Sequence, residues 1–156
     1  MLVASTDAVI VLSQRLLVVP AAPLPALPLT AAERRISRGR REAEGGVAVL
    51  LQLPREGDLK PGDVLADADG TPQVVVSAKA EPLLLVSAAE PLALLQAAYH
   101  LGNRHVALEL HTHELRLLAD SVLEAMLRQR GLTVHPLLAP FQPEAGAYSG
   151  HGHQHA

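Results

Sequence analysis

Histidine is the residue type in this sequence best suited to chemistry. The chain has eight histidines and no cysteine, which excludes disulfides, thiolate zinc sites and thiol nucleophiles. His151, His153 and His155 occupy alternate positions near the C-terminus, with Gly150 and Gly152 beside them. Imidazoles suit nickel, copper and zinc, and a flexible tail can wrap an ion without a preformed site, at an entropic cost that weakens binding. We predict that these three histidines are metal ligands; the alternative is a solubilising or expression-derived end.

His105 is the fourth candidate ligand and stands in a different context. Pro91 suits the first position of a helix that continues to Leu101, and Gly102 is the residue type that ends helices in the left-handed conformation. Beyond this turn, residues 105–110 alternate in polarity, which predicts a strand that begins on His105. One imidazole binds a divalent ion poorly and is more often structural, but a two-fold axis would double it into a shared half-site.

The remaining histidine pattern gives a weaker signal. His111 and His113 form an H-x-H pair, which fits accessory metal ligands or, less well, a metal-dependent hydrolase that would also use His105. His100 is interpreted as a structural or surface residue. Because the sequence has no P-loop, nucleophile elbow or dinucleotide-binding glycine motif, we predict that the protein is not an enzyme.

The composition narrows the class of protein further. The chain has 156 residues, enough for one ordinary domain or two small ones, and its net charge of −3 argues against a nucleic-acid binder. No apolar run approaches the roughly 18 residues of a membrane span, and the N-terminus lacks the basic region of a secretory signal. We therefore expect a cytoplasmic protein without nucleic-acid or membrane partners.

Residues 1–78 have the pattern of a small all-β domain. The aspartates at 63, 67 and 69 lack the spacing of a calcium loop, so we assign them to turns. The expected features, in chain order, are a hairpin of residues 9–12 and 16–19, a proline-rich extended connection over 20–29, a capping box at 30–33, a buried strand over 47–53, a turn at 67–70 and a strand over 73–77.

A basic run interrupts this domain. Five arginines stand between Glu33 and Glu44, at positions 34, 35, 38, 40 and 41. The favoured interpretation is a solvated edge strand whose charges prevent sheets from associating. The alternative is a docking surface for an acidic partner.

The second half predicts a ferredoxin-like domain over residues 79–140, so the fold class is α+β. Its expected elements follow the order β-α-β-β-α-β: a strand at 82–87, a helix at 91–101, strands at 105–110 and 115–118, a helix from the N-cap Asp120 to Arg130 with Gly131 as its stop, and a strand at 133–138. From residue 141 to 156 the composition is typical of a disordered, histidine-containing tail.

The run Tyr99-His-Leu-Gly-Asn-Arg-His105 resembles the motif of the urease accessory nickel metallochaperones, the UreE family. The segments 120–131 and PFQPEAGAYSG (140–150), and the histidines at the C-terminus, follow in the same order as in that family. The resemblance implies a homodimer that binds Ni(II) through His105 at its interface and delivers it, with the urease accessory GTPase, to the urease apoprotein. It also implies an N-terminal domain that holds partner proteins. Copper or zinc would compete for imidazole ligands. A metal-free adaptor and a metal-dependent hydrolase remain the alternatives.

Overall fold

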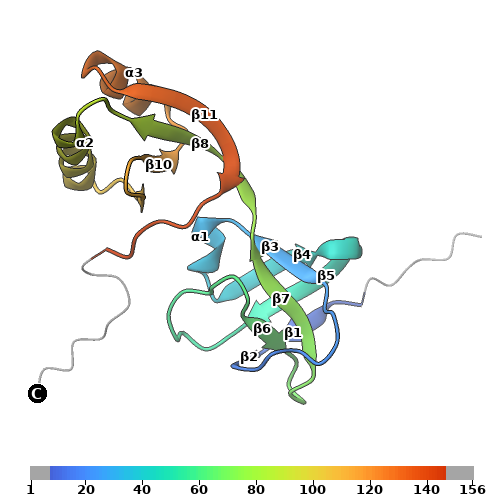
Figure 1. Cartoon of the computed structure of the whole chain (residues 1–156). Helices are drawn as coiled ribbons and strands as arrows, with labels where there is room; N and C mark the ends of the chain where they lie inside the picture. Colours follow the sequence, from blue (N-terminus) through green and yellow to red (C-terminus); the bar gives the residue numbers. More distant parts are fainter. Residues whose placement is uncertain (1–7, 147–156) are drawn as a thin grey trace, which may run out of the picture. The chain divides into compact units, whose positions relative to one another are not determined.

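The computed structural model describes residues 8–146, and the histidines at 151, 153 and 155 lie outside them. The described residues form two compact units, which divide between Ala78 and Lys79 (Figure 1). The first unit has two sheets and the second has one, and each unit has its own apolar core. No helix in the described part of the chain has the length and apolarity needed to cross a membrane. The fold class is α+β, as the sequence predicts.

The first unit is built from two sheets with an apolar core of leucine and valine side chains. One sheet has the order β1 (Ile10–Leu12), β5 (Val47–Gln52), β4 (Arg38–Ala43). The other has the order β2 (Gln14–Leu16), β6 (Val64–Ala66), β7 (Pro72–Ala78), β3 (Ala26–Leu29). Between strands stand the one-turn helix α1 (Ala31–Arg34) and the 3-10 turn η1 (Glu44–Gly46).

Local signals in the first unit place several features correctly. The capping box at α1 forms, because Glu33 N–H donates to Thr30 Oγ1 at 3.1 Å and Thr30 N–H donates to Glu33 Oε1 at 3.0 Å. Asp67 Oδ1 accepts from the amides of Asp69 and Thr71 at 2.9 and 3.0 Å, which confirms the turn. Arg38, Arg40 and Arg41 lie on the edge strand β4, as the favoured interpretation expects, whereas Arg34 and Arg35 belong to α1 and its C-cap, and Arg34 is buried.

Two predictions for the first unit are wrong. The hairpin predicted from residues 9–12 and 16–19 does not form: β1 pairs in parallel with β5, and the next strand, β2, ends at Leu16 and pairs with β6. Leu17 and Val19 are 95% and 93% exposed. The proline-rich segment is not only a connection, since its last four residues form β3 alongside β7. β3 lies at the edge of its sheet, where the N–H that Pro28 lacks is not needed for pairing.

The second unit confirms the predicted β-α-β-β-α-β order. Its elements are β8 (Ala80–Ser87), α2 (Pro91–Asn103), β9 (Glu109–Leu110), β10 (Leu115–Leu118), α3 (Ser121–Gln129) and β11 (Thr133–Pro140). The strands form an antiparallel sheet in the order β11-β8-β10-β9, the ferredoxin-like arrangement. Alternate strand residues, such as Leu84 and Val86, pack with Leu101 of α2 and Leu127 of α3 in one apolar cluster, and both helices lie beside the sheet in Figure 1.

Helix α3 begins and ends where its sequence predicts. Asp120 Oδ1 accepts from the amides of Val122 and Leu123, both at 2.9 Å, and so caps the first turn. Gly131 has φ of 84° just beyond the helix, and Leu132 N–H then donates to Leu127 O at 3.1 Å. This helix is therefore fixed at both ends by local chemistry.

Candidate functional site

The turn that holds His105 is a Schellman motif at the end of α2. His105 N–H donates to Gly102 O at 3.0 Å, and Val106 N–H donates to Leu101 O at 3.1 Å. His105 itself takes the left-handed position, with φ of 57°. Val106 packs against the apolar cluster that contains Leu101, which is the contact that usually accompanies this motif.

This geometry corrects two sequence-based predictions. Gly102 is not the left-handed stop; it lies inside the last turn of α2, and His105 takes that role three residues later. His105 does not begin a strand either, because β9 contains only Glu109 and Leu110. The alternation after His105 has another cause: Val106 is half-buried and Leu108 is buried beneath the helix, without strand pairing.

The His105 side chain is exposed and uncommitted. Its imidazole has no hydrogen bond, ion pair or ring contact with any residue between 8 and 146. Among residues 8–146, it is the one non-glycine residue with positive φ. A left-handed position costs an L-residue roughly 1–2 kcal/mol, whereas glycine adopts it freely. An imidazole at such a position, which makes no hydrogen bond, ion pair or ring contact within the described chain, is a candidate ligand.

The outer face of α2 leads to this turn. Leu92, Leu95 and Tyr99 are 63%, 67% and 66% exposed, and Gly102 follows them at a spacing of three, four and three residues on one face of the helix. At Gly102, apart from its two neighbours in the chain and the nearby backbone of its own helix, nothing in the described chain lies within 4 Å of the place a Cβ would take. The face is therefore apolar, open and flat at its end next to His105.

A cluster of polar side chains is centred on Glu109 in strand β9, four residues after His105. Glu109, whose side chain is 12% exposed, receives Gln142 N–H at 2.9 Å on Oε1. Its Oε2 lies 3.1 Å from His111 Nε2 and 3.6 Å from Arg116 Nε. Glu144 N–H donates to the carbonyl of Leu108 at 2.7 Å. The segment that follows β11 is thus fastened beside residues 108–109.

Sequence reasoning missed the role of Glu109. The contact with Gln142 joins residues that are 33 positions apart, and no local pattern marks either of them. The only available signal was the polar residue between two apolar ones at positions 108–110.

The other histidines are dispersed. His111 is occupied by Glu109, His113 is exposed, and His100 meets the ring of Tyr99 edge-on with centroids 5.4 Å apart. Within residues 8–146, no three histidine, aspartate or glutamate side chains are grouped so as to hold a metal ion. The structure therefore does not bring His105 together with His111 or His113, and any metal site at His105 needs ligands from elsewhere.

Comparisons with known proteins match both units. Residues 10–79 match the family model of the UreE urease accessory protein N-terminal domain, and residues 81–156 match that of its C-terminal domain. The chain belongs to the UreE family. A urease accessory protein UreE of Parasynechococcus marenigrum (strain WH8102) is 57% identical over 148 residues, which cover 95% of this chain and 99% of the relative.

Other UreE proteins are similar over most of their length. The UreE of Synechococcus sp. (strain WH7805) is 62% identical over 124 residues, covering 80% of this chain and 71% of the relative. The UreE of Thermosynechococcus vestitus is 57% identical over 125 residues, covering 80% and 87% respectively. The resemblance that the sequence motif suggests is thus confirmed at the level of the family.

Proposed function

We propose that this protein is a urease accessory metallochaperone that acts in the cytoplasm and is not an enzyme. A homodimer takes up Ni(II) with His105 of both subunits and with the tail histidines His151, His153 and His155. It then passes the ion to the urease activation complex, formed by the accessory GTPase and the urease apoprotein. The observation that carries this proposal is the exposed imidazole of His105, which has no polar partner within residues 8–146 and stands in a turn fixed by backbone hydrogen bonds.

A two-fold axis near His105 supplies the second ligand. Since residues 8–146 offer no group of three metal-binding side chains, His105 needs further ligands from outside this part of its own subunit. A symmetric interface doubles any residue next to the axis. The exposed apolar face of Leu92, Leu95 and Tyr99 supports this arrangement, because it is unpartnered and leads directly to the turn. Within its own subunit there is room for a side chain at Gly102. Its lack of one would let a helix of the second subunit approach closely.

The tail histidines can reach the same place. The main-chain contacts of Gln142 and Glu144 hold the start of the tail beside residues 108–109, a few residues from His105. His151 follows Glu144 by seven residues, a stretch that spans at most about 25 Å when extended. This favours a tail that serves the His105 of its own dimer.

Imidazole ligation suits a transferred ion. The nickel is cargo here, so its ligands must exchange, and mobile imidazoles can leave one at a time. Copper binds such ligands more tightly than nickel, and zinc also competes. Selection of nickel would then depend on geometry, supply and docking with the partner proteins.

The test combines nickel titration with a measurement of mass. We expect the intact chain to bind Ni(II) and to sediment as a dimer, whereas Leu95→Arg, an exposed position on α2, should sediment as a monomer and lose tight nickel binding. A version that ends at Ser149 should bind nickel more weakly but remain dimeric. A monomer that binds nickel as tightly as the parent would contradict the shared site, and an intact chain without stoichiometric binding would favour a metal-free adaptor.

A further inference from the structure

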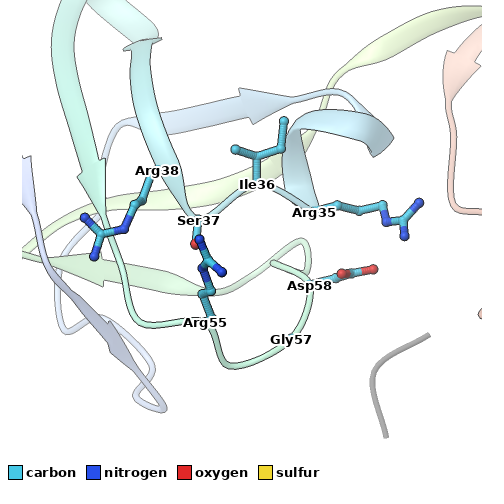
Figure 2. Close-up of a pocket in the computed structure, with 7 residues that line it drawn as sticks. All are labelled: Arg35, Ile36, Ser37, Arg38, Arg55, Gly57 and Asp58. Carbon is cyan, nitrogen blue, oxygen red and sulfur yellow. The ribbon is translucent and has the colours of Figure 1, made fainter. Parts of the chain in front are cut away.

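The first unit has an open pocket of about 440 Å³ next to the basic run. One side is the segment that joins α1 to β4, with Arg35, Ile36 and Ser37, and continues to Arg38 at the start of β4. The other side is the loop between β5 and β6, which contributes Arg55 and Asp58 (Figure 2). We propose that this pocket binds an acidic peptide segment of a partner protein.

The structure sorts the basic run into two groups. Arg34 is buried, and its Nη1 donates to Leu29 O at 2.9 Å. Arg41 Nε lies 3.5 Å from Glu33 Oε2, so this guanidinium also serves the fold. Arg35, Arg38 and Arg40 are exposed and form no ion pair with residues 8–146. These three remain available to a partner.

Charge in the pocket is unbalanced. Arg35 and Arg38 join Arg55 there, which is also exposed and unpaired within the described chain, against the single carboxylate of Asp58. In Figure 2, Arg35 and Asp58 lie toward one end, while Arg38 and Arg55 flank Ser37 toward the other. Guanidinium groups bind carboxylates through paired, charge-assisted hydrogen bonds. The end with Arg38 and Arg55 is therefore the better carboxylate site.

The walls of the pocket are fixed by contacts outside it. Leu53 N–H donates to Ser37 O at 3.0 Å and Leu59 N–H donates to Arg34 O at 2.7 Å, so the loop is fastened at both ends. Arg15 holds the middle of the loop: its Nη1 and Nη2 donate to Glu56 O at 3.3 Å and Asp58 O at 3.1 Å. Nη2 also lies 2.8 Å from Asp63 Oδ2. A preformed surface of this kind loses little entropy when a ligand binds.

The surroundings favour a peptide over a phosphate ligand. Ile36 is 49% exposed at the pocket and offers an apolar contact that a phosphate group cannot use. Mixed arginine and apolar contacts are typical of protein interfaces. A segment that alternates acidic and apolar side chains fits both features.

The test measures binding of a fluorescein-labelled peptide in which aspartates alternate with leucines, by fluorescence anisotropy with the full chain. Arg38→Glu and Arg55→Glu should each weaken binding at least about tenfold, since each replaces an attraction with a repulsion. The matched control is Arg40→Glu, an exposed arginine of β4 outside the pocket, which should change affinity less than about threefold. The same peptide with asparagines in place of aspartates should not bind. Nickel binding should be the same in all variants.

Several results would overturn the proposal. One is the absence of peptide binding by the parent chain. Another is an effect of Arg40→Glu as large as that of Arg38→Glu, which would indicate that the peptide is attracted by the positive charge of the whole surface and not by the pocket. Competition by inorganic phosphate or duplex DNA that is equally sensitive to the pocket variants would replace the peptide with a phosphate ligand. If Arg38→Glu disturbs β4, Arg55→Glu, which lies in the loop between β5 and β6, gives the same comparison with that strand intact.

Discussion

Replacing His105 with glycine should separate the two roles that this position has in the structure. The turn requires a left-handed residue, and φ of 57° is one that glycine adopts without strain. Glycine removes the strain of the left-handed conformation, which stabilises the fold by roughly 1–2 kcal/mol. Glycine also loses more chain entropy on folding, which destabilises the fold by about 0.5–1 kcal/mol. Because the imidazole has no hydrogen bond, ion pair or ring contact within the described chain, the substitution removes no such interaction. We therefore expect His105→Gly to be more stable by about 0.5–1 kcal/mol and to lose tight nickel binding.

Two further substitutions bracket this result. Asparagine tolerates the left-handed conformation, so His105→Asn should keep the parent stability while it removes the imidazole. Valine does not tolerate it, so His105→Val should be destabilised by about 1 kcal/mol or more. His135→Asn is the matched control, because it removes an exposed histidine from β11 and should leave nickel binding unchanged.

The assays are urea denaturation and Ni(II) calorimetry on the same preparations. A change in the denaturation midpoint at constant slope reports stability alone. If His105→Gly were destabilised by 1 kcal/mol, the side chain would have a structural function that the exposed imidazole does not reveal. If it bound nickel as tightly as the parent, the half-site would be refuted.

Three other perturbations test the surrounding arguments. Nickel affinity should fall as the pH drops through about 6.5, because imidazoles must be neutral to bind metal; equal affinity on both sides of that pH would exclude them. The amide of Thr71 and then the side chain of Gln73 lower the pKa of Asp67 below its usual 3.8, so its carboxylate stabilises the fold above that value and this stability is lost as the pH falls through the lowered pKa. Asp67→Asn should thus lower the urea midpoint at neutral pH but not in strong acid; a difference that persists in acid would refute the assignment. Glu109→Ala should speed hydrogen exchange of the Gln142 amide and weaken nickel binding several-fold, whereas Glu109→Gln, which keeps an acceptor, should change both less.

Features encoded by short-range chemistry could be predicted from the sequence. The Asp120 cap, the Thr30 capping box and the Asp67 turn depend on side chains that bond to amides two to four residues away. The order of elements in the second unit follows from apolar periodicity, which distinguishes its helices from its strands. The position of His105 next to a helix end was also predictable, because an apolar, helix-forming run precedes it and Gly102, a residue type that ends helices, lies between them.

Features that depend on distant partners could not be predicted. β1 and β2 look like a hairpin locally, but each finds its partner strand far along the chain. β3 contains Pro28 and is a strand only because β7 offers it an edge. At the candidate site, Gly102 was expected to end α2, but the helix continues to Asn103, and the bonds of His105 and Val106 then close it in the Schellman motif. Glu109 acquires its role from Gln142, which no periodicity relates to it.

The one-residue link at Ser13, between β1 and β2, has a consequence for how the first unit folds. Leu12 ends a strand of one sheet and Gln14 begins a strand of the other, so a single residue joins the two sheets. Pairing of β1 with β5 closes a long loop, and the entropy lost in that step also brings β2 close to β6. Only the loop between β5 and β6 then remains to be closed for the second pairing. Both sheets should consequently assemble in one cooperative step, and neither should persist once the other has melted.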